Sequence, residues 1–493
     1  MKKKFLTNLI LILSLNLLIK PFWILGIDRV VQNIVGAEEY GFYYAVLNLS
    51  FIFNIFLDFG LTNFNNRNIA QNHHLLNKYF SGILAMKIML GILYAIITLA
   101  IGFIIGYDAH QMKILYILIF NQVLISFVLY LRSNLSGLHL FKTDSLISVL
   151  DRFLMIIFCA IMIWGGFSNF QIDIKWFVYA QTLAYFITAA VAFVIVVSKA
   201  SFSRLYWNPK FYIVVFRQSI PFAILVLLMS FYNRIDSVMI ERLLPGTTGA
   251  YQSGIYASAY RLLDASNMIA YLFSVLLLPI FARMIKQKEY VGEIVKLSIS
   301  LLIIPAAIVA VACLAYRVEL MQLMYPIHHS ESIIEYQARL AQSSTIFGIL
   351  MLCFVAISST YIFGSLLTAN GNLKQLNTIA ASGMALNILV NLVVIPKFLA
   401  VGAAYTSLIT QTTTAALQIG LAIYIFKFNF NKKYFLKFII FGFIAVAFVY
   451  LTKNFVENWL IGISIFVVSS IFIAVIFRLI NIREMFKIFT LEE

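Results

Sequence analysis

Long apolar runs recur from one end of the chain to the other, and short polar loops separate them. A helix needs about 20 consecutive apolar residues to cross the hydrocarbon core of a bilayer. The pattern therefore predicts an all-α polytopic membrane protein with about 14 transmembrane helices. The predicted spans are 5–27, 40–62, 80–106, 112–138, 145–165, 175–198, 211–242, 250–281, 293–316, 340–369, 375–396, 400–426, 434–452 and 457–480.

The composition agrees with this pattern. Of the 493 residues 62% are hydrophobic and 11% are charged, whereas a soluble domain carries about 25% charged residues. The net charge of +16 is spread over loops between spans, which does not indicate a nucleic-acid partner. Cys159, Cys313 and Cys353 all lie in apolar runs without metal-site spacing, so we expect no disulfide framework and no metal site. We also expect no cofactor and no catalytic residue.

The loop charges orient the chain. With the N-terminus in the cytoplasm, 23 of the 36 Lys and Arg residues fall on the inner side and 8 on the outer side. Cytoplasmic loops of membrane proteins carry this excess of positive charge. The distribution predicts that both termini of the chain are cytoplasmic.

The sequence contains a weak internal repeat with a period of about 200 residues. Residues 21–49 and 221–262 both contain Pro-Phe, then Ile-Asp, then a glycine and tyrosine where the next span begins. The repeat predicts an N-lobe of spans 1–6 (1–204) and a C-lobe of spans 7–12 (205–427), followed by two additional spans and a cytoplasmic tail (428–493). Two six-helix lobes in a V around a central cleft are typical of a transporter that works by alternating access.

Ionisable side chains inside the predicted spans mark a candidate site. An ionisable residue at bilayer depth is costly and usually faces protein or a water-filled pathway. The cations favour an anionic head group, and the planar fork of an arginine suits phosphate. The candidate substrate-binding residues are Arg234, Arg261, Arg29 and Lys20; Asp264, Asp236 and Asp58 would balance charge or bind a coupling ion; Tyr256, Tyr260 and Asn267 would line the cavity.

A structural interpretation of the same residues stays open. Arg234 could pair with Asp264, and Arg261 with Asp236, only to hold helices together. For Lys87 we expect that the ammonium extends to the inner membrane interface.

Several motifs occur in an order that resembles a known family. They include IVGAEEYGFYYAVLNL, SIPFAILVLLMSFYNRIDSVMI, SGIYASAYRLLD and NILVNLVVIPKFLAVGAAYTSLITQ. The set resembles the polysaccharide-flippase branch of the multidrug/oligosaccharidyl-lipid/polysaccharide exporter superfamily. The resemblance implies export of an undecaprenyl-pyrophosphate-linked oligosaccharide, such as an O-antigen or capsule repeat unit of lipopolysaccharide-type pathways, across a bacterial inner membrane. It also implies that Arg29, Arg234, Arg261 and Lys20 hold the pyrophosphate.

Other functions remain as alternatives. A multidrug or cation antiporter of the same superfamily would favour an acidic cavity, and a membrane-embedded polysaccharide polymerase or ligase would need an acid/base set. His328 and His329 in the longest outer loop do not form such a set. No Walker motif occurs, so an ion gradient of protons or sodium is the expected driving force. The expected partners are the lipid-linked oligosaccharide, the lipid bilayer, a coupling cation and a polymerase of the same pathway.

Overall fold

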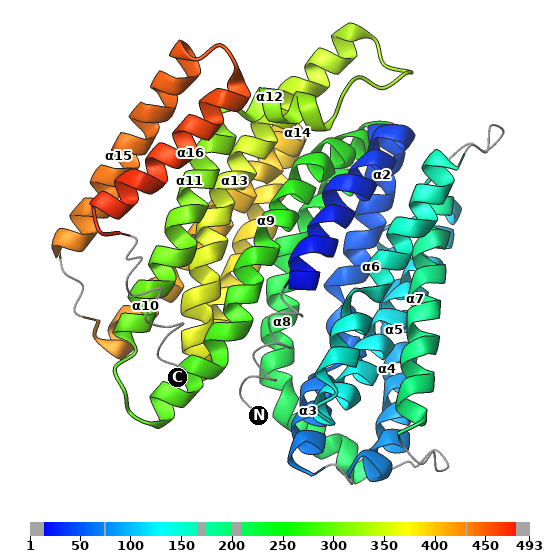
Figure 1. Ribbon diagram of the computed structural model, residues 1–493. Coiled ribbons are helices and arrows are strands. Elements are labelled where there is room, and N and C mark those ends of the chain that lie inside the picture. Colours follow the sequence, from blue (N-terminus) through cyan, green and yellow to red (C-terminus); the bar gives the residue numbers. More distant parts are fainter. Residues whose placement is uncertain (1–13, 73–74, 166–172, 200–208, 429–431, 480–493) are drawn as a thin grey trace. The chain divides into compact units, whose positions relative to one another are not determined.

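The computed structural model describes residues 14–72, 75–165, 173–199, 209–428 and 432–479, and every element in these ranges is helical. The chain forms two compact units, Met1–Ala257 and Ser258–Glu493, which meet within one long helix, α9 (Thr247–Lys286). Figure 1 shows the helices of each unit.

The first unit contains the helices of predicted spans 1–7 and the beginning of span 8. Within it α5 packs against α7, α6 packs against α7, and α2 packs against α8. Its elements are η1 (Trp23–Asp28), α2 (Arg29–Ile52), η2 (Asn54–Leu57), α3 (Leu61–Gln71), α4 (Leu75–Ile104), α5 (Ala109–Gly137), α6 (Phe141–Trp164), α7 (Ile174–Val197) and α8 (Pro209–Leu243).

The second unit contains the remainder of α9 and the later helices. Its elements are α10 (Gly292–Ser298), η3 (Ile299–Ile303), α11 (Ile304–Ala315), α12 (Arg317–Met324), α13 (Ile333–Ala369), α14 (Leu373–Phe426), α15 (Lys432–Phe455) and α16 (Trp459–Ile476). The last two helices pack against α11 around buried side chains such as Ile308, Phe441 and Phe466. The two additional spans therefore pack onto span 9.

Eleven helices among the described residues are long and apolar enough to cross a membrane. The long helix α14 holds two predicted spans, because the backbone of Leu399 is not helical (φ 56°) and Gly402 packs directly against Val394. The other two predicted spans correspond to residues 14–52, which contain η1 and α2. The all-α polytopic fold and a count of about 14 spans are thus confirmed.

Two predicted boundaries near the N-terminus were wrong. Helical structure continues beyond residue 27 to Gly36, where a positive φ of 84° reverses the chain direction. Span 2 then begins at Ala37 and is not a continuous helix. Its α-helix α2 ends at Ile52, the short η2 follows, and the next α-helix, α3, begins at Leu61. A positive φ suits glycine because it has no Cβ, which explains Gly36 at the turn.

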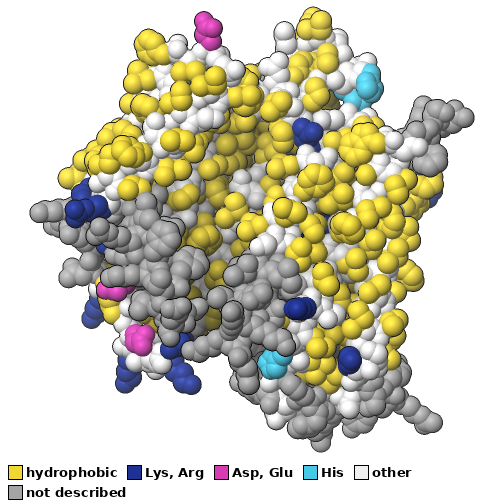
Figure 2. Space-filling model, in the orientation of Figure 1, with side chains coloured by type: hydrophobic (Ala, Val, Ile, Leu, Met, Phe, Trp, Pro, Cys, Tyr) yellow, Lys and Arg dark blue, Asp and Glu magenta, His cyan; other side chains and the backbone are white. Residues whose placement is uncertain are grey.

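Apolar side chains cover much of the outer surface of the helices. On the face drawn in Figure 2 hydrophobic groups predominate, and lysine and arginine are few. On α4, Ile88, Ile92 and Ile96 are each more than half exposed and lie four residues apart, hence on one face of the helix. An exposed apolar face of this kind fits a lipid environment.

Candidate functional site

Lys20 lies in a cationic region of the first unit. Its nearest charged neighbours include Arg152 and Asp151 on α6. The Arg152 guanidinium lies 5.8 Å from the ring centre of Trp23 and 5.7 Å from that of Tyr185, and its Nε lies 3.7 Å from Asp151. Within the described residues no ion pair joins Lys20 to a carboxylate. The positive charge of Lys20 is therefore not balanced by an ion pair in this part of the described chain.

Arg29 and Arg234 lie on α2 and α8 of the same unit. Arg29 is the first residue of α2, directly after the π-helical segment η1. The Arg234 guanidinium stacks 5.8 Å from the ring centre of Phe51, near the end of α2. Such a cation–π contact offsets part of the cost of removing water from the guanidinium. Both side chains are only partly buried.

Arg261 and Asp264 lie one turn apart on α9, in the second unit. Their charged groups are 3.9 Å apart, and the two side chains are 16% and 15% exposed. This is a long contact for an ion pair and lacks bidentate geometry. Nearby on the same helix Tyr260 is buried, and the Oδ1 atom of Asn267 is buried without a hydrogen-bond partner among the described residues.

Asp236 and Tyr256 form a buried pair that has a counterpart in the other repeat. The Tyr256 hydroxyl donates to Asp236 at 2.8 Å, and both residues are 1% exposed. The Tyr40 hydroxyl donates in the same way to Asp28 at 2.9 Å. The aspartate of each Ile-Asp motif in the repeat thus accepts a hydrogen bond from a tyrosine of its own. Asp28 was not among the predicted site residues, although its place in the repeat could have marked it.

Asp58 lies where span 2 is broken, and its partner is Lys87. The Lys87 ammonium forms an ion pair with Asp58, and Lys87 is only 6% exposed. The prediction that Lys87 extends to the inner interface was therefore wrong. The side chain lies inside the first unit because a partly buried carboxylate and two further oxygen acceptors bind it there.

Glycines let spans 2 and 8 approach until their backbones touch. A Cβ on Gly41 would lie 1.9 Å from the Ala250 carbonyl oxygen, and a Cβ on Gly254 would lie 1.8 Å from the Ala37 carbonyl oxygen. The Ser253 hydroxyl also donates to the Gly41 carbonyl at 3.1 Å. Small residues allow this kind of close helix contact in membranes. The contact is reciprocal between the matching segments GAEEYG and GAYQSG of the repeat.

Hydrogen bonds also join span 7, which is helix α8, to α2 and α5. The Asn48 side chain on α2 donates to the Ser237 hydroxyl at 2.7 Å. The Gln111 side chain on α5 donates to Glu241 at 2.6 Å, and Arg242 donates to the Gly106 carbonyl at 3.0 Å. Most of these residues lie near ends of spans that the loop charges predict to face outside. Ser237 and Glu241, one turn apart on span 7, thus bind side chains of spans 2 and 4.

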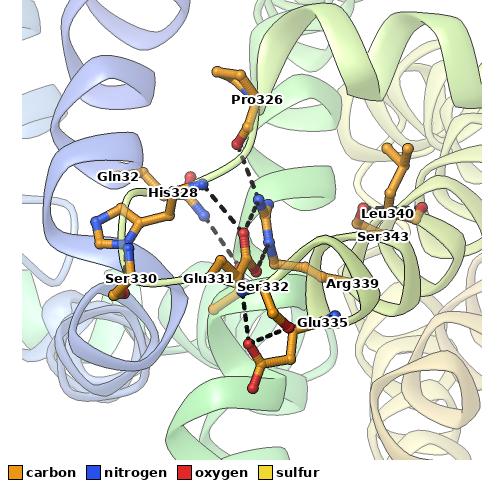
Figure 3. Close-up of polar contacts among 11 residues, drawn as sticks. Gln32, Pro326, His328, Ser330, Glu331, Ser332, Glu335, Arg339, Leu340 and Ser343 are labelled. Atoms are coloured by element: carbon orange, nitrogen blue, oxygen red, sulfur yellow. Dashed lines mark hydrogen bonds and ion pairs between the residues drawn. The ribbon is translucent and has the colours of Figure 1, made fainter.

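The polar loop before α13 is organised as a helix cap (Figure 3). Ser332 and Glu335 form a capping box, and Arg339 donates to Glu331 at 2.6 Å and 2.9 Å. Burial raises the pKa of Glu331, but bonds from Arg339 and the His328 amide outweigh it, so the pKa lies below its usual value. These contacts are those of a stabilised helix start.

Comparison with known families decides the relationship. Residues 5–285 match the family described as polysaccharide biosynthesis protein. The chain belongs to this family. No curated protein matches the chain by sequence.

Solved structures share the fold. The chain is similar to the lipid II flippase MurJ in an inward closed conformation, with 14% identity, 95% of this chain and 98% of that one covered, and a TM-score of 0.70. It is also similar to the Vibrio cholerae MATE transporter VcmN in its bent form (13% identity, 85% and 97% covered, TM-score 0.51). A transporter of the MOP superfamily from Pyrococcus furiosus is a further match (14% identity, 85% of this chain and 94% of that one covered, TM-score 0.53). These similarities confirm a multi-pass membrane fold, and the family match connects the chain with polysaccharide biosynthesis.

Proposed function

We propose that the chain is a flippase for an undecaprenyl-pyrophosphate-linked oligosaccharide repeat unit. It moves this unit from the cytoplasmic to the periplasmic leaflet of a bacterial inner membrane, with both of its own termini in the cytoplasm. The lobes 1–204 and 205–427 alternate access to a central site, and a gradient of protons or sodium drives the cycle. A polymerase of the same pathway receives the flipped unit. The family match supports a role in polysaccharide biosynthesis.

The observation that carries this proposal is a pair of neighbouring cations, Lys20 and Arg152, that have the carboxylate of Asp151 in common. The Lys20 ammonium lies near Arg152, which already has Asp151 as a partner. Like charges inside a membrane protein repel each other, and the cost is removed when an anion binds between them. The pyrophosphate of a lipid-linked sugar is such an anion, and we propose that it binds at the membrane depth of Lys20 and Arg152.

The remaining cations fit the same ligand. Arg29 and Arg234 lie on helices of the first unit, and Arg261 lies on α9. A pyrophosphate has enough oxygens for several guanidinium forks, each giving two parallel hydrogen bonds. The Arg261 guanidinium lies 3.9 Å from Asp264 without bidentate geometry, and in the proposed site a phosphate would compete with this carboxylate for it. Asp264 and Asp236 then balance charge in the empty state, whereas the Asp58 carboxylate is paired with Lys87.

Complementation of a deletion strain tests the proposal. In cells that lack this gene, the intact chain should restore surface polysaccharide and lower the amount of lipid-linked repeat unit. Lys20→Ala should lower export about 10- to 100-fold, because a charge-assisted hydrogen bond is worth about 1.5–3 kcal/mol. Lys20→Arg should keep most activity. Lys113→Ala, a change at an exposed lysine of α5, is the matched control and should behave like the intact chain.

Two outcomes would contradict the proposal. One is a deletion strain whose surface polysaccharide and lipid-linked intermediates are unchanged. The other is a strain whose tolerance to cationic drugs falls while its polysaccharide stays normal, which would favour the antiporter. Membrane levels of each variant are measured alongside, so that loss of protein is separated from loss of export.

A further inference from the structure

The break in span 2 brings backbone and side-chain oxygens together inside the first unit. The helix ends at Ile52, a short 3-10 turn follows, and Phe59 and Gly60 both have positive φ angles of 42° and 81°. A non-glycine residue in this conformation is strained. Backbone groups released by a broken membrane helix need other partners, and in transporters such groups bind ions.

Three oxygens converge on the Lys87 ammonium at this break. They are the Leu57 carbonyl at 3.0 Å, the Ser126 hydroxyl at 2.9 Å and the Asp58 carboxylate. An ammonium has three donors, so the number of acceptors matches the number of its hydrogens. The ammonium comes from α4, the hydroxyl from α5 and the other two groups from the break itself.

The carboxylate is held in place by its own neighbours. The Thr62 hydroxyl donates to Asp58 Oδ1 at 2.5 Å, and the Thr62 amide donates at 3.3 Å. The Ser126 hydroxyl in turn lies 3.2 Å from the Leu57 carbonyl. Apolar side chains of Leu61, Met86 and Leu90 form a buried cluster next to the pair. Low polarity around an ion pair makes the loss of one partner costly.

A carboxylate, a backbone carbonyl and a hydroxyl at a helix break form the kind of oxygen set that binds a hard cation. We propose that this break is an alkali-cation site that the chain fills with its own lysine. The Lys87 ammonium is a tethered cation that takes the place of sodium and holds the broken segment of span 2. The intact protein then needs no dissolved cation here, and a coupling ion must bind elsewhere. This inference does not depend on which substrate is transported.

Removing the tethered charge should turn the break into a sodium site. Lys87→Ala leaves Asp58 without its partner but opens room for an ion. Its thermal midpoint should fall in choline chloride and rise by about 4 °C or more in about 150 mM NaCl or LiCl, because a ligand that binds only the folded state stabilises it. The intact protein and the control Lys113→Ala should have the same midpoint in all these salts at equal ionic strength.

The double variant Asp58→Asn/Lys87→Ala separates a site from a general salt effect. It lacks the carboxylate, so its midpoint should not depend on sodium. A Lys87→Ala midpoint that is equal in choline and sodium, or a double variant that responds like the single one, would overturn the proposal. If Lys87→Ala is not recovered from membranes in either salt, Lys87→Ser is compared in its place. Its short side chain leaves room for an ion and brings no charge, so a midpoint that does not depend on sodium would overturn the proposal in the same way.

Discussion

Arg261 shows how a single charged residue can be read in two ways. Its guanidinium lies 3.9 Å from Asp264 on the next turn of α9, so this carboxylate is within reach but the contact is not bidentate. The proposed role of Arg261 is that of a substrate ligand, and the alternative is a structural pair with Asp264.

The Arg261 variants distinguish binding from structural pairing. Arg261→Ala should reduce export about tenfold or more, and Arg261→Lys should restore it only in part, because lysine keeps the charge but loses the fork. Export is measured as surface polysaccharide in the complemented deletion strain.

The double variant Arg261→Ala/Asp264→Ala is the decisive comparison. Under the ligand role it folds, reaches the membrane and remains inactive. If the arginine only balances Asp264, removing both charges leaves nothing unpaired, and export returns. A double variant with normal export would rule out Arg261 as a substrate ligand.

Sequence identified some of the charged residues and misjudged others for physical reasons. Arg234, Asp236, Arg261 and Asp264 were visible because charge inside an apolar run is costly wherever it lies. The position of Lys87 was misjudged because its partner Asp58 lies 29 positions earlier in the chain. The two side chains come into contact at the break in span 2, which the sequence analysis did not predict. Arg152 was not among the candidate residues, because its contacts with Trp23 and Tyr185 depend on packing between distant helices.

At the scale of elements, the close contact between spans 2 and 8 is the main feature. Gly41 and Gly254 bring the two backbones together, and the bond between Asn48 and Ser237 adds a contact between spans 2 and 7. Span 2 belongs to the proposed N-lobe, whereas spans 7 and 8 belong to the proposed C-lobe. Alternating access would require these contacts to break when the outer side opens.

A cysteine pair tests this requirement. Cys159, Cys313 and Cys353 are first replaced by alanine, and Asn48→Cys and Ser237→Cys are then combined. A short cross-linker that forms disulfides with both engineered cysteines should stop export. Export should return after the disulfides are reduced. The Asn65→Cys/Ser133→Cys pair, from side chains 2.8 Å apart within the proposed N-lobe, should cross-link without stopping export. Full cross-linking of the first pair with unchanged export would show that these helices need not separate.

Element boundaries were predicted well where apolar content ends and poorly where only the backbone changes. The spans from residue 80 to residue 198 lie within a few residues of α4 to α7, because polar loops delimit them. The break in span 2 escaped notice because Phe53, Phe56 and Phe59 keep the segment apolar through it. Apolar content alone does not report backbone angles, and Gly60 was the one local signal of a break.

At the scale of the whole molecule, fold class and family follow from the same constraint. Every backbone group within lipid must be bonded internally, so a chain with recurrent apolar runs of this length can only be a helical membrane protein. The family match over residues 5–285 then connects this fold to polysaccharide biosynthesis. The identity of the sugar does not follow from this constraint, because apolar runs and the family match carry no information on which hydroxyl groups the site binds.

The leaflet in which the lipid-linked repeat unit accumulates tests the central claim most directly. Spheroplasts of the deletion strain, with and without the intact chain, are labelled with a radioactive precursor of the sugar and treated from outside with a glycosidase that does not cross the membrane. The account predicts that the enzyme cleaves most of the labelled unit when the chain is present and little of it when the chain is absent. Equal cleavage in both strains, with the other enzymes of the pathway intact, would contradict the account, because the unit would then reach the outer leaflet without this protein.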